Sequence, residues 1–309
     1  MVNYTRFLSR LPAPGGGGAH TAIFGAGCHG ARAGLTQEQV CADVRAHLPH
    51  GRRHVPDREI EDGVAAGFAD VAGGGSKPYR PAPAVAPGTF ERLVREGRGA
   101  TEADIRARSP VAIDWPDWEA SWRLLEALYA PDLLIFAGEE KQVGWIGTTI
   151  RPAGEWAAAF KQWRSVPCPR IQINPVTGRP APKKSGEGVT LRGDGCVADH
   201  RYALAEMDGA SIEDQLAFWF AVPRLPVVAL IHSGGKSIHA WLRVDCADAA
   251  EWRREVEERL FPAYLEPLGV DGSCKNAARM SRMPEHVRAD TGQVQRLFYL
   301  APEGRAVRG

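Results

Sequence analysis

The chain has 309 residues, of which 44% are hydrophobic and 24% are charged, and 38 Lys and Arg against 37 Asp and Glu leave a net charge of +1. This length suggests about two domains of roughly 150 residues each. The composition excludes a disordered acidic chain and a protein that coats polyanions through its overall charge. The longest apolar stretches, such as residues 227–231, are too short to span a bilayer, and the six Cys include no CxxC pair. We therefore expect a cytoplasmic protein with reduced thiols and no membrane partner.

Charge is distributed unevenly along the second half of the chain. Residues 160–193 carry seven Lys or Arg against one Glu, and residues 194–220 carry six acidic residues against one Arg. Residues 275–309 are basic again, with seven Lys or Arg against three acidic residues. Acidic residues between two basic segments are what a metal-dependent enzyme acting on phosphates needs, although solvated charge runs give the same pattern.

The N-terminal part opens with a segment rich in Pro and Gly and continues into two expected helices. In residues 35–48 apolar side chains recur at helical spacing, and Thr36 with Gln39 forms a candidate capping box. Residues 55–70 show the same periodicity. Residues 73–88 are rich in Gly and then in Pro, which predicts an extended spacer. The predicted organisation is a small helical accessory domain (1–72), a linker (73–88) and a larger domain (89–309).

Helices and strands are mixed in the larger domain. Helices are predicted over residues 89–97, 101–108, 115–129, 154–163 and 211–221, and from about 247 to 261. Strands are predicted over residues 133–139, 170–174, 200–208, 227–232, 237–245 and 295–300. Residues 175–188 are predicted to form a loop, and residues 233–236 a turn between two strands. This pattern favours an α+β (mixed α/β) domain over a doubly wound parallel sheet.

Two acidic residues, Glu206 and Asp208, are separated by one residue at the end of a predicted strand. Because residues two apart on a strand point to the same face, both carboxylates are expected to project together while Met207 packs on the other side. Two adjacent carboxylates repel each other unless a cation lies between them, and Mg²⁺ or Mn²⁺ prefers such oxygen ligands. The alternative is a strand end where both acids are simply solvated.

The segment Ser233-Gly234-Gly235-Lys236-Ser237-Ile238-His239 follows another predicted strand. Its GKS sequence suggests a nucleotide-binding P-loop, but that motif requires glycine where this chain has Leu230, and a strand follows instead of a helix. A tight Gly-Gly turn can still present backbone N–H groups and the Lys236 ammonium to a phosphate, and Ser237 shares a strand face with His239. An ordinary surface hairpin is the alternative.

A third acidic residue, Asp271, follows Val270 and precedes a cluster of arginines at positions 279, 282 and 288. A third carboxylate would complete a metal-binding group, and guanidinium groups donate bidentate hydrogen bonds to phosphate oxygens. Each feature is common alone, but the combination of acid pair, hairpin, third acid and arginines within one domain is much less common.

These motifs, "AEMD", "SGGKSIHAW", "GVD" and "ARMSRMP", resemble those of the archaeo-eukaryotic primase superfamily, in its primase-polymerase branch from bacterial mobile elements and phages. That family has a strand with two acids one residue apart, then Ser-x-His, then an apolar residue followed by Asp. The resemblance covers roughly residues 130–300. One departure is Glu206, where Asp is more usual in the family.

The resemblance implies a primase-type catalytic domain with an RRM-like sheet that performs template-directed nucleotidyl transfer, synthesising primers and DNA. Glu206, Asp208 and Asp271 would hold two Mg²⁺ or Mn²⁺ ions, and His239 would complete the catalytic set. The incoming triphosphate would contact Ser233, Gly234, Gly235, Lys236, Ser237, His239, Arg279 and Arg282. Single-stranded template DNA would follow Arg170, Lys183, Lys184 and Arg192 in the basic segment.

Several alternatives remain open at this stage. The same fold serves a primer-dependent repair or translesion polymerase, and a non-catalytic single-stranded-DNA or origin-binding replication module would not need the acids. A metal-dependent nuclease would use paired acids but not the triphosphate hairpin. Zinc is not expected, because the possible ligand groups (Cys168, Cys196 and His200; Cys28, His29, Cys41 and His47) contain no CxxC. The chain carries no helicase motif, so we expect a separate helicase as partner.

Overall fold

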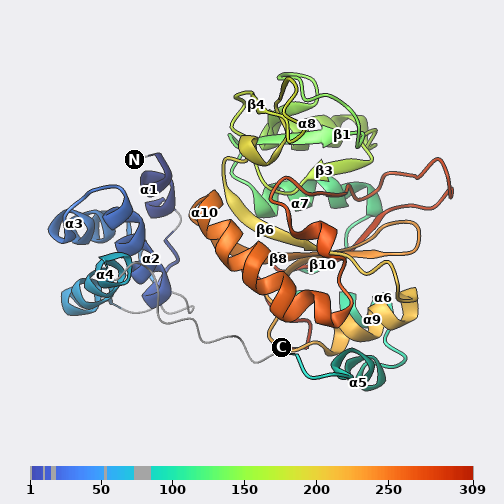
Figure 1. Ribbon diagram of the computed structural model, residues 1–309, viewed down its shortest axis with the longest axis horizontal. Coiled ribbons are helices and arrows are strands. Elements are labelled where there is room, and N and C mark those ends of the chain that lie inside the picture. The colour runs from blue at the N-terminus through green and yellow to red at the C-terminus, as the bar shows by residue number, and fades with distance from the viewer. Residues whose placement is uncertain (1, 10, 15–18, 52–53, 73–84, 309) are drawn as a thin grey trace. The chain divides into compact units, whose positions relative to one another are not determined.

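The structure is a computed structural model that describes residues 2–9, 11–14, 19–51, 54–72 and 85–308. The chain divides into two compact units, Met1–Pro81 and Ala82–Gly309 (Figure 1). The predicted linker, residues 73–88, falls mainly on residues 73–84, which lie outside the described residues. No helix in the described ranges combines the length and apolar character that crossing a membrane requires.

The first unit is helical throughout its described residues. It contains α1 (Val2–Leu8), α2 (Ala19–Arg32), α3 (Gln37–His47) and α4 (Asp57–Ala72). The predicted capping box of Thr36 and Gln39 begins α3. The sequence prediction missed α1 and α2, because the glycines of α2 favour a loop. In the fold they allow close packing, since a Cβ at Gly27 would lie only 2.5 Å from the Val64 carbonyl oxygen of α4.

The second unit is built around a four-stranded antiparallel sheet with the order β10-β7-β8-β6. Its strands are β6 (His200–Ala205), β7 (Val227–His232), β8 (Ile238–Cys246) and β10 (Arg296–Leu300). Their side chains alternate between two cores, as a period of two requires. Ala240 and Leu242 face one core, whereas Trp241 and Tyr202 face the other.

Helices cover the first of these two faces. They are α5 (Thr89–Glu96), α9 (Ile212–Ala221) and α10 (Ala249–Trp252), which continues as a π-helix over Arg253–Leu265. In Figure 1 this last helix, in orange, crosses the strands of the sheet. The shorter α6 (Glu102–Arg106) contacts β10. The long predicted helix 247–261 therefore extends to Leu265 with a changed hydrogen-bond register, and Pro262, which has no N–H to donate, lies inside it.

A second antiparallel sheet, with the order β2-β1-β3-β9, lies on the other side together with α7 (Ala120–Leu128) and α8 (Ala153–Trp163). Its strands are β1 (Leu134–Gly138), β2 (Ile150–Pro152), β3 (Arg170–Gln172) and β9 (Met280–Arg282). A small hairpin of β4 (Ala181–Pro182) and β5 (Val189–Thr190) lies inside the region predicted as a loop. The expectation of a mixed α/β domain preceded by a small all-α domain is confirmed. Both four-stranded sheets of the larger domain are antiparallel.

The structure differs from the strand predictions near the end of β6 and at β9. The strand predicted over 200–208 ends at Ala205, because the Glu206 carbonyl accepts a hydrogen bond from the Asp271 N–H at 2.9 Å instead of continuing the ladder with β8. Strand β9 was not predicted at all. Its three residues owe their strand conformation to antiparallel pairing with β3, a partner more than one hundred positions away in the sequence.

Candidate functional site

The predicted acidic residues and the predicted hairpin come together where β6 ends and β8 begins. Glu206 follows β6, and its Oε1 accepts a 2.8 Å hydrogen bond from the Ser237 hydroxyl. His239 Nε2 lies 3.2 Å from the same oxygen, within ion-pair distance but off the line of a hydrogen bond. Met207 between the two acids is buried in the opposite core, as the alternation predicts.

Glu206 is held in its ionised form. Its side chain is only 18% exposed. Burial alone would raise the pKa of this carboxyl, but contacts with His239 and Ser237, and the more distant charge of Arg279, lower it to about 2. The carboxylate is therefore charged at every physiological pH and available to a cationic ligand.

His239 is almost fully buried and is oriented by a chain of hydrogen bonds from β8 and β9. Trp241 Nε1 donates to Ser281 Oγ at 2.7 Å, and the same Oγ lies 3.2 Å from His239 Nδ1. Because Ser281 Oγ accepts from the indole, its own proton can be donated to Nδ1, which leaves the ring proton on Nε2 facing Glu206. The sequence prediction missed Ser281, although it lies between Arg279 and Arg282 in the motif that supplied them.

The other two acids lie beside Glu206 with partners of their own. Asp271 is joined to Glu206 through the backbone, and its carboxylate accepts hydrogen bonds from Ser273 N at 2.8 Å and Ser273 Oγ at 2.6 Å. These bonds lower the pKa of Asp271, and the charge of Arg279 lowers it further. Asp208 is exposed and forms an ion pair with Lys236 at 3.2 Å.

The three carboxylates fit Mg²⁺ or Mn²⁺ by donor type, since hard divalent cations take carboxylate oxygens. Within the described residues, however, no group of three or more Asp, Glu, His or Cys side chains is arranged so that it could hold a metal ion. Asp208 is directed to Lys236, whose ammonium supplies positive charge next to the acids. A metal ion bound by all three acids would replace that ion pair.

The Gly-Gly turn lies next to an arginine side chain. Gly234 has φ +68°, a conformation that favours glycine, and its N–H donates to His232 Nδ1 at 3.0 Å. That donor is therefore already paired. A Cβ at Gly235 would lie 2.5 Å from Arg288 Nη1, so glycine here leaves room for the guanidinium. Arg288 itself pairs with Asp290.

Two arginines of the second sheet and one from the segment that follows β9 form an arginine cluster. Arg170 of β3 and Arg282 of β9 are direct cross-strand neighbours, and Arg288 is close enough to act on Arg282 electrostatically. Burial lowers the pKa of Arg282 to about 10, and repulsion from Arg170 and Arg288 adds to this. Its Nε is buried without a hydrogen-bond partner, and Arg282 forms no ion pair within the described ranges. A bound anion would relieve this repulsion.

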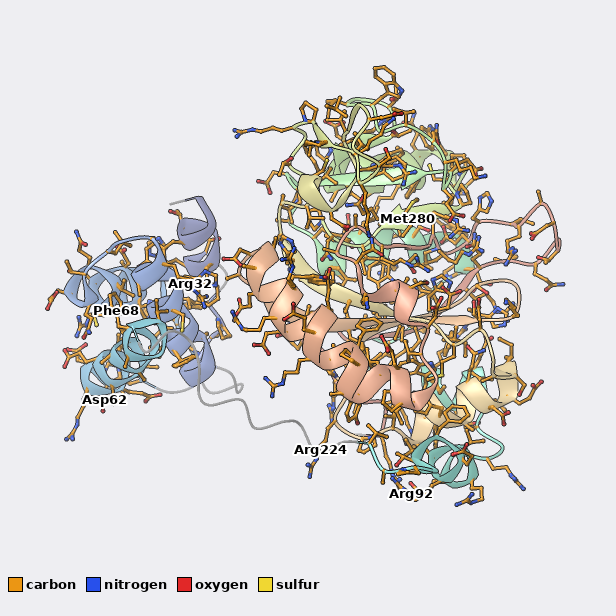
Figure 2. All side chains as sticks on the ribbon, in the orientation of Figure 1. Arg32, Asp62, Phe68, Arg92, Arg224 and Met280 are labelled. Atoms are coloured by element: carbon orange, nitrogen blue, oxygen red, sulfur yellow. The ribbon has the colours of Figure 1, made fainter. Side chains whose placement is uncertain are left out.

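The four predicted template contacts lie in different settings. Lys183 and Lys184 are exposed at the tip of the β4–β5 hairpin. Arg170 forms an ion pair with Glu140 at 2.8 Å. Arg192 donates to the carbonyls of Glu140 and Gln142, and it lies 3.2 Å from the sulfur of Met280, the β9 residue labelled in Figure 2.

Comparison with known proteins gave one solved structure. No family model matches the chain, and no curated protein matches it. The chain is similar to "Cyanophage S-2L Primase-Polymerase (PrimPol), AEP domain (PP-N190)", with 19% sequence identity and a TM-score of 0.39. The match covers 62% of this chain and 92% of that chain.

Proposed function

We propose that the chain catalyses template-directed nucleotidyl transfer on single-stranded DNA, as a member of the archaeo-eukaryotic primase superfamily. One observation carries the proposal. The ionised carboxylate of Glu206 lies beside Asp271 and within electrostatic range of Arg279 and Arg282. Acids that accept a divalent cation, next to arginines that accept phosphate oxygens, are what a nucleoside triphosphate site requires.

Glu206, Asp208 and Asp271 are the residues that would hold Mg²⁺ or Mn²⁺. When bound, such ions lower the pKa of an attacking 3′-hydroxyl and neutralise charge on the α-phosphate and the leaving pyrophosphate. The acids need no general-base role in this scheme, because they serve as ligands in their ionised form.

The other residues bind and orient the substrate. Arg282, Arg288 and Lys236 would donate to phosphate oxygens, and the anion would offset the repulsion within the arginine cluster. His239, with its proton on Nε2, would donate to a triphosphate oxygen next to Glu206. Ser237 keeps the Glu206 carboxylate in place. A separate helicase would supply single-stranded template in the cytoplasm.

The test is incorporation of labelled nucleotides on single-stranded DNA, without and with a primer, in the presence of Mg²⁺ or Mn²⁺. Asp271→Asn should abolish synthesis while the protein remains folded, because it removes a charge needed for ion binding but keeps the Ser273 contacts. Asp114→Asn, an exposed acid outside the site, is the matched control and should be fully active.

The products separate the candidate activities. Synthesis without a primer identifies a primase, and extension of a primer alone identifies a primer-dependent repair or translesion polymerase. Shortening of a labelled strand identifies a nuclease. Full activity of Asp271→Asn would contradict the assignment of this acid to the catalytic site. DNA binding by the wild-type protein without any turnover would contradict the proposal and favour a non-catalytic binding module.

A further inference from the structure

Four large apolar side chains are exposed on two neighbouring segments beside the second sheet. Val143, Trp145 and Ile146 are 59%, 64% and 54% exposed in the loop 139–149 between β1 and β2, which we call the tryptophan loop. Val189 is 63% exposed on β5. We call residues 177–192, which include β4 and β5, the basic hairpin. Exposed apolar side chains that are gathered in this way mark a binding surface more often than single ones do.

The two segments are in direct contact. Arg192 at the end of the basic hairpin donates a 2.8 Å hydrogen bond to the Gln142 carbonyl of the tryptophan loop. A Cβ at Gly144 would lie 3.1 Å from the Cβ of Leu191, and a Cβ at Gly178 would lie 3.6 Å from Ile146 Cδ1. The segments that carry Trp145 and Val189 therefore pack against each other. Arg192 joins the tryptophan loop to the basic hairpin, so its guanidinium is not free to bind the DNA backbone.

The backbone around Trp145 is fixed by hydrogen bonds. The Trp145 carbonyl accepts from the N–H groups of Thr149 at 3.0 Å and Ile150 at 2.9 Å, and the Trp145 N–H donates to Thr149 Oγ1 at 2.8 Å. The turn closes at Gly147, whose φ of +81° favours glycine. Because the loop is ordered before any ligand arrives, contact with the indole costs little conformational entropy.

Positive charge lies next to this apolar surface. Arg179, Lys183 and Lys184 of the basic hairpin are exposed, and none of the three forms an ion pair within the part of the chain that the structure describes. Glu187 is the only acidic residue of the basic hairpin. An exposed indole and unpaired cations on two segments in contact match a ligand that has both flat apolar faces and a regular negative charge. Single-stranded DNA has both.

The surface is connected to the candidate site through the base of the tryptophan loop. Glu140 of the loop pairs with Arg170, which is the cross-strand neighbour of Arg282. Arg192 contacts Met280, which lies next to Ser281 on β9. A DNA strand bound at the tryptophan loop would therefore be held by the same β-sheet that carries Arg170 and Arg282.

We propose that the tryptophan loop and the basic hairpin bind the single-stranded DNA template, with a base stacked on Trp145 and the backbone phosphates on Lys183, Lys184 and Arg179. This inference adds a template-binding surface to the proposed function. The choice of DNA as the ligand rests on that function. Trp145 is a binding residue in this assignment and takes no part in the chemistry.

The test is the fluorescence anisotropy of a labelled oligodeoxythymidylate of about 20 nucleotides, titrated with the full chain without nucleotide or metal. Trp145→Ala should weaken binding about tenfold, the usual cost of losing one stacked base, and Trp145→Phe should recover most of it. Trp163→Ala, which removes another exposed indole (45% exposed), is the matched control and should bind like wild type. The double variant Lys183→Ala, Lys184→Ala should lower the slope of log Kd against log salt by about one to two.

The outcomes separate this inference from the proposed function. Wild-type affinity in Trp145→Ala, or no binding by the wild-type protein, overturns the inference. So does a change in oligomeric state in Trp145→Ala without a change in DNA affinity, since a second copy of the chain would then cover the surface. If Trp145→Ala binds the oligonucleotide weakly but the wild-type protein incorporates no nucleotide with or without a primer, the proposed function fails and the DNA-binding surface stands.

Discussion

Glu206 is stabilised in its ionised form by a hydroxyl and an imidazole, and within the described residues no lysine or arginine forms an ion pair with it. A fixed ammonium on this carboxylate would compete with a divalent cation, whereas Ser237 stabilises the ionised form without adding charge. Lys236 pairs with the exposed Asp208 instead, where solvent weakens the attraction and the pair can open at little cost. The buried Glu206 therefore keeps its partners, whereas the exposed Asp208 can exchange Lys236 for another cation.

The hydroxyl of Ser281 is expected to position His239, since it is the acceptor for Trp241 and the neighbour of His239 Nδ1. Ser281→Ala should lower the rate of nucleotide incorporation about tenfold, the usual effect of losing a group that orients a functional imidazole. Steady-state kinetics of primer extension would measure it.

The split between kcat and melting temperature separates positioning from packing. Without the Ser281 hydroxyl the proton of the His239 ring is no longer directed to Nε2, so kcat should fall. Trp241→Phe keeps the Ser281 hydroxyl but removes the indole N–H that orients it, so kcat should fall by less. An unchanged kcat for Ser281→Ala, with only a lower melting temperature, would show that Ser281 has a packing role alone.

At the element scale, the N-terminus of α7 packs on a buried carboxyl from the segment after β9. Ser121 N donates to Glu285 Oε1 at 3.3 Å, and Ser121 Oγ donates to the Pro284 carbonyl at 2.6 Å. Burial raises the pKa of Glu285 to about 7 despite these donors. A carboxyl whose pKa is raised in the folded state stabilises the fold most below the unfolded pKa of about 4.5, and this contribution is lost as the pH rises through 7.

Glu285→Gln should therefore raise the melting temperature at pH 8.5 by a few degrees, because the amide keeps the acceptor for Ser121 N without the buried charge. The gain should shrink toward zero as the pH falls below about 4.5, where the carboxyl becomes protonated in the unfolded state as well. Differential scanning calorimetry at several pH values would measure it, with the exposed Glu213→Gln as control. A gain that is the same at every pH would contradict the buried-charge explanation.

The elements that could be predicted from sequence are those whose pattern is local. Residues 227–232 form a strand as predicted, since their apolar run is bounded by a proline and the Gly-Gly turn, and residues 211–221 form a helix capped by Ser211. The grouping of Glu206 with Ser237 and His239 came from the family resemblance, and in the structure it arises because β6 and β8 pair directly. What could not be predicted from local pattern depends on partners distant in sequence. Strand β9 exists through β3, and the glycines of α2 are explained by the side chains and backbone of α1, α3 and α4 that pack against them.

At the scale of the whole molecule, the two units have separate cores. The core of the first unit includes Ile60 of α4, and one core of the second includes Ile231 of β7; both side chains are almost completely buried. None of the buried clusters in the described residues contains side chains from both units. Residues that share a hydrophobic core usually unfold together. Each unit is therefore expected to unfold in its own transition.

The expected result is two transitions in calorimetry of the full chain, each sensitive to one of a matched pair of substitutions. Ile60→Ala and Ile231→Ala remove the same atoms and should each cost about 2 to 5 kcal/mol. Ile60→Ala should lower or abolish only the transition of the helical unit, because Ile60 lies in the core of that unit and α4 packs against α2 and α3. Ile231→Ala should lower only the other, together with DNA synthesis. If Ile60→Ala lowers both transitions equally, the two units unfold as one cooperative body, and the helical unit then contributes directly to the stability of the candidate site.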